Sequence, residues 1–166
     1  MSLPLTLDTP IFDLKFKVGN DTPNNNDGSF MGLLPLKKAL GYSRNIPAIK
    51  MYFSVGGQEK LVPFFNSIGI DSYKENADYG YPMAIGSAEL KMIELANAYM
   101  HLSAMGRPAT INPILEIRGS DGQILYQKQP KQQKQIIPEG VAHLIWKILA
   151  DSANLPSTWV NNFKIK

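Results

Sequence analysis

The tripeptide Ser43-Arg44-Asn45 carries the side chains of this chain that are best suited to chemistry. It stands between an amphipathic segment that stops at Gly41 and a second one that begins at Ile46. A serine hydroxyl donates and accepts hydrogen bonds at once and can therefore carry a proton, while an asparagine carboxamide can hold an amide. Ser-x-Asn is a short pattern, however, and the same residues also suit helix punctuation, as a C-terminal turn residue and an N-cap.

The elements that would position this tripeptide are predicted from the spacing of apolar residues. Pro35 suits a first helical turn, and the apolar stripe that follows it stops at Gly41. Asn45 can cap a second helix, which Gly56-Gly57 ends. Ser87 is expected to cap the longest helix. The predicted helices cover 35–40, 46–55, 58–67, 87–105 and 141–150.

Two of these helices have wide apolar faces that are predicted to point inward. The faces consist of Leu90, Ile93, Tyr99 and Leu102 in the helix over 87–105, and of Leu144, Ile145, Ile148 and Leu149 in the helix over 141–150. Such faces need a partner to pack against, so both helices are expected to contribute to the core.

After Pro108 the apolar residues follow a β-type period. The runs 111–118 and 123–127 are predicted to form a hairpin, with Asp121-Gly122 in its turn. Residues 1–34 hold turn clusters and are expected to be extended segments and loops laid over a core. The segment 128–135 is predicted to be a polar loop, and 154–166 have no convincing pattern.

Composition limits the classes of protein to which the chain can belong. Its 166 residues, 44% of them hydrophobic, describe one globular domain or a large piece of one. The absence of cysteine excludes disulfides, thiol catalysis and thiolate metal sites. A formal net charge of +3, with lysines scattered or interleaved with glutamines, gives no indication of nucleic-acid binding.

No pattern predicts a cofactor, a metal or a membrane span. His101 and His143 lack neighbours that could share a metal, so both are interpreted as ordinary, partly buried histidines. No segment approaches the roughly 20 apolar residues needed to cross a bilayer. Residues 1–3 lack the features of a signal peptide and are expected to be a cloning scar joined to an internal segment.

The surroundings of the tripeptide follow a longer pattern, P-x-N-x-D/N-G-x-F-x-G followed by L-x-x-A-L-x-x-S-x-N-x-P-A. The residues that match it, in order, are Pro23, Asn25, Asp27, Gly28, Phe30, Gly32, Leu36, Ala39, Leu40, Ser43, Asn45, Pro47 and Ala48. Further matches are Val55-Gly56, Gly69-Ile70, Tyr79-Gly80, 84–89, Leu95-Ala96, Ala98-Tyr99, Asn112-Pro113, Ile117 and Asp121-Gly122. Over residues 23–126, and more weakly to about 160, the chain resembles the transpeptidase domain of class A penicillin-binding proteins.

The resemblance implies an α+β parent fold, in which an antiparallel sheet flanked by helices stands beside an all-helical subdomain. This chain would be mainly helical, with one β-hairpin and little of the central sheet. In the family, an S-x-x-K serine attacks a D-Ala-D-Ala stem peptide, its lysine acts as the base, and the acyl-enzyme cross-links peptidoglycan. Ser43 would then pass a proton to the departing D-alanine, and Asn45 would hold the substrate amide and the catalytic lysine. Tyr79 would border the substrate cleft, with a structural turn as the alternative.

The chain departs from the family in lacking the other two active-site motifs. No serine is followed three residues later by lysine, and no lysine is followed by Thr-Gly or Ser-Gly. Residues 1–166 are therefore expected to be the part of a transpeptidase domain between S-x-x-K and K-T-G, without activity of its own. The glycosyltransferase domain of a class A enzyme is absent from it.

Two hypotheses remain open at this point. The first is a piece of a peptidoglycan D,D-transpeptidase outside the cytoplasmic membrane, anchored through a region N-terminal to this segment, whose intact form binds β-lactams. The second is a binding or scaffold module that keeps the helical subdomain without the chemistry. S-x-x-K upstream and K-T-G downstream in the parent would favour the first.

Overall fold

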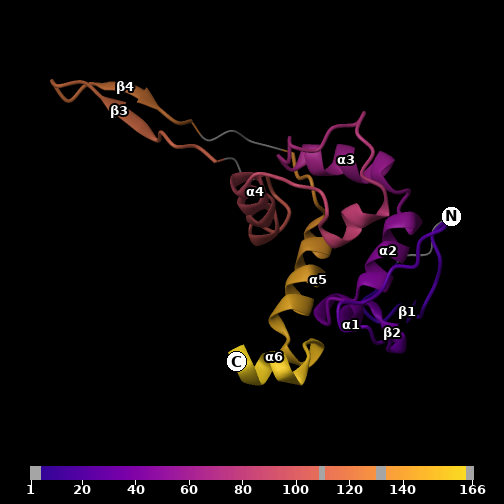
Figure 1. Ribbon diagram of the computed structural model, residues 1–166. Coiled ribbons are helices and arrows are strands. Elements are labelled where there is room, and N and C mark those ends of the chain that lie inside the picture. Colours follow the sequence, from indigo (N-terminus) through magenta and orange to yellow (C-terminus); the bar gives the residue numbers. More distant parts are fainter. Residues whose placement is uncertain (1–4, 109–110, 130–133, 164–166) are drawn as a thin grey trace.

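The computed structural model describes residues 5–108, 111–129 and 134–163 (Figure 1). The first half contains β1 (Pro10–Asp13), β2 (Gly32–Pro35), α1 (Leu36–Gly41), α2 (Asn45–Ser54), α3 (Gln58–Ser67) and a 3₁₀ helix (Tyr81–Ile85). The second half contains α4 (Met92–Ser103), β3 (Glu116–Arg118), β4 (Ile124–Gln127), α5 (Glu139–Ala150), a 3₁₀ helix (Ser152–Asn154) and α6 (Ser157–Phe163). The predicted scar over 1–3 and part of the predicted polar loop, 130–133, lie outside the described residues.

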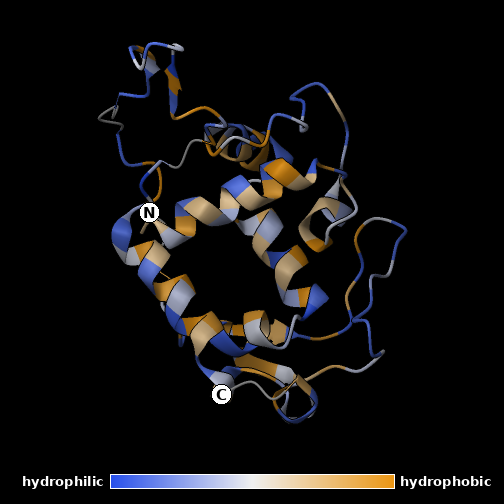
Figure 2. Ribbon diagram, turned by 90° about the vertical axis from the view of Figure 1, so that its left-hand side faces the viewer, coloured by the Kyte–Doolittle hydropathy of each residue, from blue (hydrophilic) through white to orange (hydrophobic). Residues whose placement is uncertain are grey.

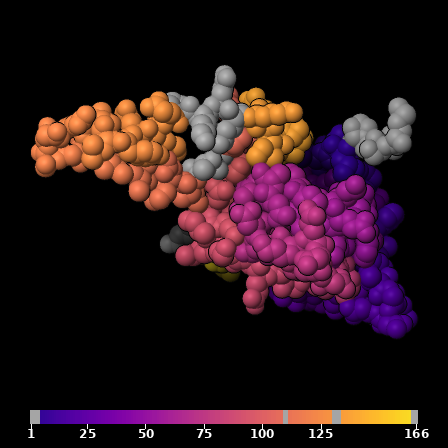
Figure 3. Space-filling model, turned by 90° about the horizontal axis from the view of Figure 1, so that it is seen from above, coloured from indigo at the N-terminus to yellow at the C-terminus, as the bar shows by residue number. Residues whose placement is uncertain are grey.

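The mainly helical composition and the β3–β4 hairpin confirm the predictions from sequence. Helix α5 runs between α4 and α1, and the Trp146 indole Nε1 donates a hydrogen bond to the carbonyl oxygen of Leu102 in α4 at 2.9 Å (Figure 1). Strands β3 and β4 pair antiparallel and project away from the helices (Figures 1 and 3). No helix in the described part of the chain is both long and apolar enough to cross a bilayer.

A second antiparallel pair, β1–β2, forms from residues that were expected only to be extended segments and loops. Phe12 pairs with Leu33, and Asp13 pairs with Gly32. The two strands are separated by residues 14–31, so no tight-turn signal marks them as partners in the sequence. The pairing places the carboxyl end of β1 beside the start of β2, close to α1 and α2 (Figure 1).

The start of α4 corrects the prediction for the helix over 87–105. Ser87 does not cap it: its backbone N–H bonds the Pro82 carbonyl oxygen at 3.2 Å, and Lys91 is the N-cap. The Tyr73 hydroxyl donates to the Ala88 carbonyl at 3.1 Å. Residues 87–91 are therefore held by the 3₁₀ helix and by Tyr73, and the α-helix begins only at Met92.

The C-terminal residues also form more structure than predicted. Residues 154–166 were expected to lack a pattern, but 157–163 form helix α6. Seven residues are too few for sequence periodicity to reveal a short helix, because helices of this length depend on tertiary contacts.

The core lies around α2, α3 and the 3₁₀ helix that precedes α4. Its buried cluster consists of Tyr52, Val62, Ile68, Ile70, Tyr73, Met83, Ile137 and Ala142. Figure 2 shows the helices arranged in a ring, each carrying both hydrophobic and hydrophilic residues. Near the Ser43 turn, Ile46 and Ile49 of α2 are completely buried.

Several apolar residues that were predicted to point inward are exposed. Ile93 and Tyr99 of α4 are 56% and 59% exposed, and Leu144 and Leu149 of α5 are 36% and 47% exposed. Only Ile148 of the residues predicted on the α5 face is fully buried. The physical reason is that the described elements cover only part of each stripe: Leu90 and Leu102 pack on the core cluster, whereas Ile93 and Tyr99 stay exposed. Periodicity alone did not reveal which part of a stripe has a partner.

The approach of Gly106 to Ile137 yields a test of the packing. Gly106 has φ +82°, and a Cβ there would overlap the Ile137 carbonyl oxygen, whereas Gly86 has φ +89° and no atom within 4 Å of its ideal Cβ. Gly106→Ala should therefore lower the free energy of unfolding by about 1–3 kcal/mol more than Gly86→Ala, since only the first overpacks its surroundings. Urea unfolding followed by circular dichroism measures both variants, and equal losses would contradict the contact.

Candidate active site

Ser43 lies at the tip of the turn between α1 and α2 in a left-handed backbone conformation. Its φ is +53°, which is uncommon for a residue other than glycine and costs roughly 1–2 kcal/mol. The turn is closed by hydrogen bonds from the Ser43 N–H to Leu40 O at 2.9 Å and from the Arg44 N–H to Ala39 O at 3.0 Å. The Ser43 side chain is exposed and has no hydrogen-bond partner among the described residues.

A hollow of about 770 Å³ opens in front of this turn. Its walls come from the loop before β2, from the turn itself, from Ile85 and from the residues around the start of α6. They are formed by Asn26, Asp27, Ser29, Met31, Tyr42, Ser43, Arg44, Asn45, Ile85, Pro156, Thr158 and Trp159. Ser43 and Asn45 also line an adjoining, more apolar hollow of about 450 Å³. The two predicted catalytic side chains therefore share one concave surface.

Asn45 is the first residue of α2 and does not act as its N-cap. Arg44 occupies the cap position, and no side chain makes a capping hydrogen bond there. The Asn45 amide Nδ2 instead donates to the Asn24 carbonyl oxygen at 3.0 Å. This bond holds the carboxamide toward the loop that forms the opposite wall of the hollow. Asn45 is not the cap because it is already the first helical residue.

The middle residue of the tripeptide has a buried guanidinium, a feature that the sequence analysis missed. Arg44 is 7% exposed, and its Nε donates to a carboxylate oxygen of Asp13, which is completely buried, at 2.8 Å. Its Nη1 donates to Asp27 at 2.9 Å. An unpaired charge at this depth would be costly, so the two carboxylates determine where the side chain lies.

Asn25 connects this ion pair to the start of α2. Its Nδ2 donates to Asp13 at 2.7 Å and to the Ser29 carbonyl oxygen at 2.8 Å, and its Oδ1 accepts from the Ile46 N–H at 3.3 Å. Asn25 and Asp27 both belong to the pattern shared with the family, and that match was the signal that could have found them. Asp13 lies before the matched segment, so nothing in the sequence identified it.

Hydrogen bonding favours the charged forms of Arg44 and Asp27. Burial by itself would lower the pKa of Arg44, but the hydrogen bonds to Asp27 and Asp13 raise it above its ordinary value. The pKa of Asp27 is held well below its usual range by the hydrogen bond from Arg44 and by two more from Ser29. Arg44 and Asp27 are thus both charged at neutral pH.

Tyr79 lies away from the two hollows that Ser43 and Asn45 line. Its hydroxyl accepts a hydrogen bond from the Lys74 N–H at 2.9 Å, and its ring packs 5.5 Å from the ring of Tyr73. Its own N–H donates to the Gln58 side chain at 2.8 Å. Tyr79 packs against the buried core cluster and lines neither hollow, so its substrate-binding role stays a prediction.

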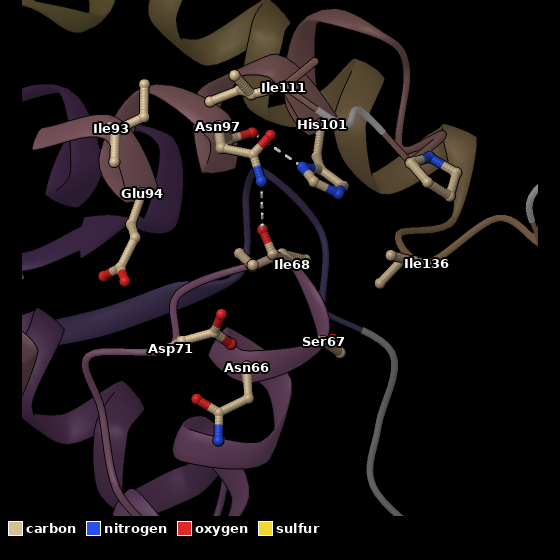
Figure 4. A pocket seen from close by; sticks show the side chains of 12 residues that line it. Asn66, Ser67, Ile68, Asp71, Ile93, Glu94, Asn97, His101, Ile111 and Ile136 are labelled. Carbon is tan, nitrogen blue, oxygen red and sulfur yellow. Dashed lines mark hydrogen bonds between the residues drawn. The ribbon is translucent and has the colours of Figure 1, made fainter. Parts of the chain in front are cut away.

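A further hollow of about 500 Å³ lies between the end of α3 and α4 (Figure 4). Asn97 Nδ2 donates to the Ile68 carbonyl at 3.3 Å, and His101 Nδ1 bonds the Asn97 carbonyl at 2.9 Å (Figure 4). Glu94 accepts from the Ser72 N–H at 3.3 Å, and this bond, followed by one from Lys91, lowers its pKa. The polar groups at this junction mainly bond one another, which indicates a packing role.

Neither histidine is placed to hold a metal. His101 is buried in α4, at 3% exposure, whereas His143 is exposed on α5 rather than partly buried as predicted. Across the described ranges, no group of three or more histidine, aspartate or glutamate side chains is arranged around a common point.

Comparison with known proteins adds evidence of ancestry. Penicillin-binding protein 1B of Buchnera aphidicola is 31% identical over 141 residues, or 82% of this chain, and penicillin-binding protein 1A of Neisseria cinerea is 30% identical over 134 residues, or 78%. The chain belongs to the penicillin-binding protein family. It spans only 18% and 16%, respectively, of the lengths of these relatives. No protein-family model matches this penicillin-binding protein segment.

The fold agrees with this assignment. The penicillin-binding protein PonA1 from Mycobacterium tuberculosis superimposes with a TM-score of 0.74 at 20% identity, over 83% of this chain and 39% of that chain. This likeness concerns the fold alone. It confirms the predicted class, a mainly helical portion of the α+β transpeptidase domain of penicillin-binding proteins.

The lowered pKa of Asp27 predicts how stability depends on pH. A carboxyl group whose pKa is lower in the folded than in the unfolded chain stabilises fully above its ordinary pKa of about 3.9, and this stabilisation is lost as the pH falls toward the folded value. The difference in free energy of unfolding between wild type and Asp27→Asn should therefore be largest near pH 7 and shrink toward pH 3.

Urea unfolding at a series of pH values measures this difference. Asp78→Asn is the control, because Asp78 is exposed and has no hydrogen bond or ion pair within the described ranges. If the difference in free energy of unfolding between wild type and Asp27→Asn stays constant down to pH 3, the assignment of the ion pair with Arg44 is contradicted.

Proposed function

We propose that this chain is part of a serine-type D,D-transpeptidase that cross-links peptidoglycan stem peptides through an acyl-serine intermediate. The observation that carries the proposal is that Ser43 and Asn45, which match the S-x-N motif of the family, line one hollow. PonA1, which shares the fold, has been solved in complex with penicillin V. A β-lactam resembles D-Ala-D-Ala, so we infer that both occupy the cleft of which this hollow is one wall.

In the proposed reaction the nucleophile is the serine of an S-x-x-K motif, which these 166 residues do not contain. Its oxygen forms a bond to the carbonyl carbon of the penultimate D-alanine, and the peptide bond to the terminal D-alanine breaks. The leaving nitrogen needs a proton, and the exposed Ser43 hydroxyl is suited to deliver it. The amine of a neighbouring stem peptide then attacks the acyl-serine, releases the serine and completes the cross-link.

Asn45 has the complementary role of holding groups in place. One N–H of its amide donates to Asn24, which orients the carboxamide. Its remaining donor and its carbonyl oxygen can bond the substrate amide and the lysine of S-x-x-K. Tyr79 would border the substrate cleft at a distance from Ser43, since it lines neither of the two hollows there. No cofactor is required for this chemistry.

We place residues 1–166 between S-x-x-K and K-T-G of the parent domain, so the isolated chain would be inactive. The parent would act outside the cytoplasmic membrane, held there by a region N-terminal to this segment. Its partners would be stem peptides and, as inhibitors, β-lactams.

Labelling with a fluorescent penicillin tests the proposal. The longer protein that contains this sequence should give a labelled band on a denaturing gel, and the 166-residue chain should give none. Ser43→Ala and Ser43→Gly in the longer protein should each slow labelling by about 100-fold or more, because the proton donor is lost in both. Glycine tolerates φ +53° without strain, so agreement between the two variants separates chemistry from backbone effects.

Ser120→Ala is the matched control, since Ser120 is an exposed turn residue of the hairpin. Labelling of the isolated chain would contradict the assignment of the missing nucleophile. A longer protein that folds but takes no label would favour the binding or scaffold module instead.

A further inference from the structure

The residue between the two motif side chains differs from them in having a buried side chain, which is 7% exposed. The Arg44 guanidinium bonds Asp13 at the end of β1 and Asp27 in the loop before β2. Its Nη2 also donates to the Ser29 carbonyl oxygen at 2.5 Å. A planar, five-donor guanidinium can serve all three acceptors at once, which a lysine ammonium at the end of a flexible stem cannot.

The same loop holds the chain at three successive residues. Arg44 is bound through Asp27 and Ser29, Asn45 donates to the Asn24 carbonyl oxygen at 3.0 Å, and the Ile46 N–H donates to Asn25 at 3.3 Å. Ser43 comes directly before this clamped stretch, and its own hydroxyl bonds no described residue. No hydrogen bond to a described residue fixes its Oγ, so the backbone conformation of Ser43 determines the region that the hydroxyl can reach.

That backbone is in a conformation that serine does not prefer. A left-handed φ at a residue other than glycine persists only where the surrounding structure over-determines it, and such residues concentrate at functional sites. On its N-terminal side, Ser43 is held by backbone hydrogen bonds to α1. On its C-terminal side, the buried ion pair is the strongest restraint, because Arg44 cannot leave Asp13 without stranding two charges.

We propose that Arg44 is a positioning residue: its buried pair with Asp13 keeps Ser43 left-handed and so aims the hydroxyl into the hollow. Breaking the pair would let Ser43 relax to an ordinary φ, which would turn the hydroxyl away from the leaving group. The effect of Arg44 on proton transfer by Ser43 rests on the proposed function. Its effect on the φ angle of Ser43 does not.

The test compares Arg44→Lys with Lys37→Gln. Arg44→Lys keeps the positive charge but loses the planar set of guanidinium donors. Lys37→Gln removes a half-exposed cation that lies away from the turn and forms an ion pair with Asp8 at 2.6 Å. In the 166-residue chain, the ³J(HN–Hα) coupling and Cα shift of Ser43 report its φ. Both should leave their left-handed values in Arg44→Lys and stay unchanged in Lys37→Gln.

In the longer protein, the penicillin acylation rate constant should fall by about 100-fold in Arg44→Lys, as expected when a reacting group is displaced by about an ångström. Prior non-covalent binding of penicillin should change little, and the fraction of molecules that become labelled should stay close to that of wild type. Lys37→Gln should acylate at the wild-type rate.

A purely structural role predicts the reverse, a reduced labelled fraction with an unchanged rate constant, and that result would overturn the proposal. So would Ser43 signals that keep their left-handed values in Arg44→Lys. If Arg44→Lys does not fold, Asp13→Asn, which keeps the shape of the side chain, must move the Ser43 signals for the proposal to survive. If the longer wild-type protein is not acylated by penicillin, the proposed function is refuted. The coupling and Cα shift of Ser43 would still test whether Arg44 positions Ser43.

Discussion

The carboxylate of Asp13 is completely buried at the end of β1 and accepts hydrogen bonds from Asn25, Met31 and Arg44. Removing one partner of a buried ion pair costs about 3–5 kcal/mol, because the other charge is left without compensation. β1 must therefore remain beside the α1–α2 turn, and the loop before β2 must remain closed over it. Two walls of the hollow at Ser43, the loop before β2 and the turn itself, depend on this pair.

The molecule divides its polar and apolar contacts between two regions. The site is held by ion pairs and by side-chain hydrogen bonds to backbone groups, while the apolar cluster that includes Tyr52 and Tyr73 meets α2 near its C-terminal end. The exposed faces of α4 and α5 belong to neither region. Exposed apolar faces of this kind are typical of surfaces that pack on a further element.

Most helices could be predicted from the sequence because their signals are local. The segments over α1, α2 and α3 agree closely with the structure, since Pro35, Gly41 and Gly56-Gly57 punctuate them through their own backbone preferences. The prediction was wrong at the start of α4, where the contacts of Ser87 and Ala88 outweighed capping propensity. It was also wrong for the apolar faces, because periodicity identifies an apolar stripe and not its partner.

By itself, the sequence determined the family and the helical character, because both are encoded in the order and spacing of residues. It also predicted Ser43 and Asn45 as site residues, from the same spacing. Only the tertiary structure decided that Arg44 points inward, that Asp13 is its partner and that Ser43 takes a left-handed φ. Arg44 and Asp13 lie 31 residues apart, separated by an irregular loop, β2 and α1. A buried charge selects its partner by proximity in the folded chain, and no local pattern encodes that choice.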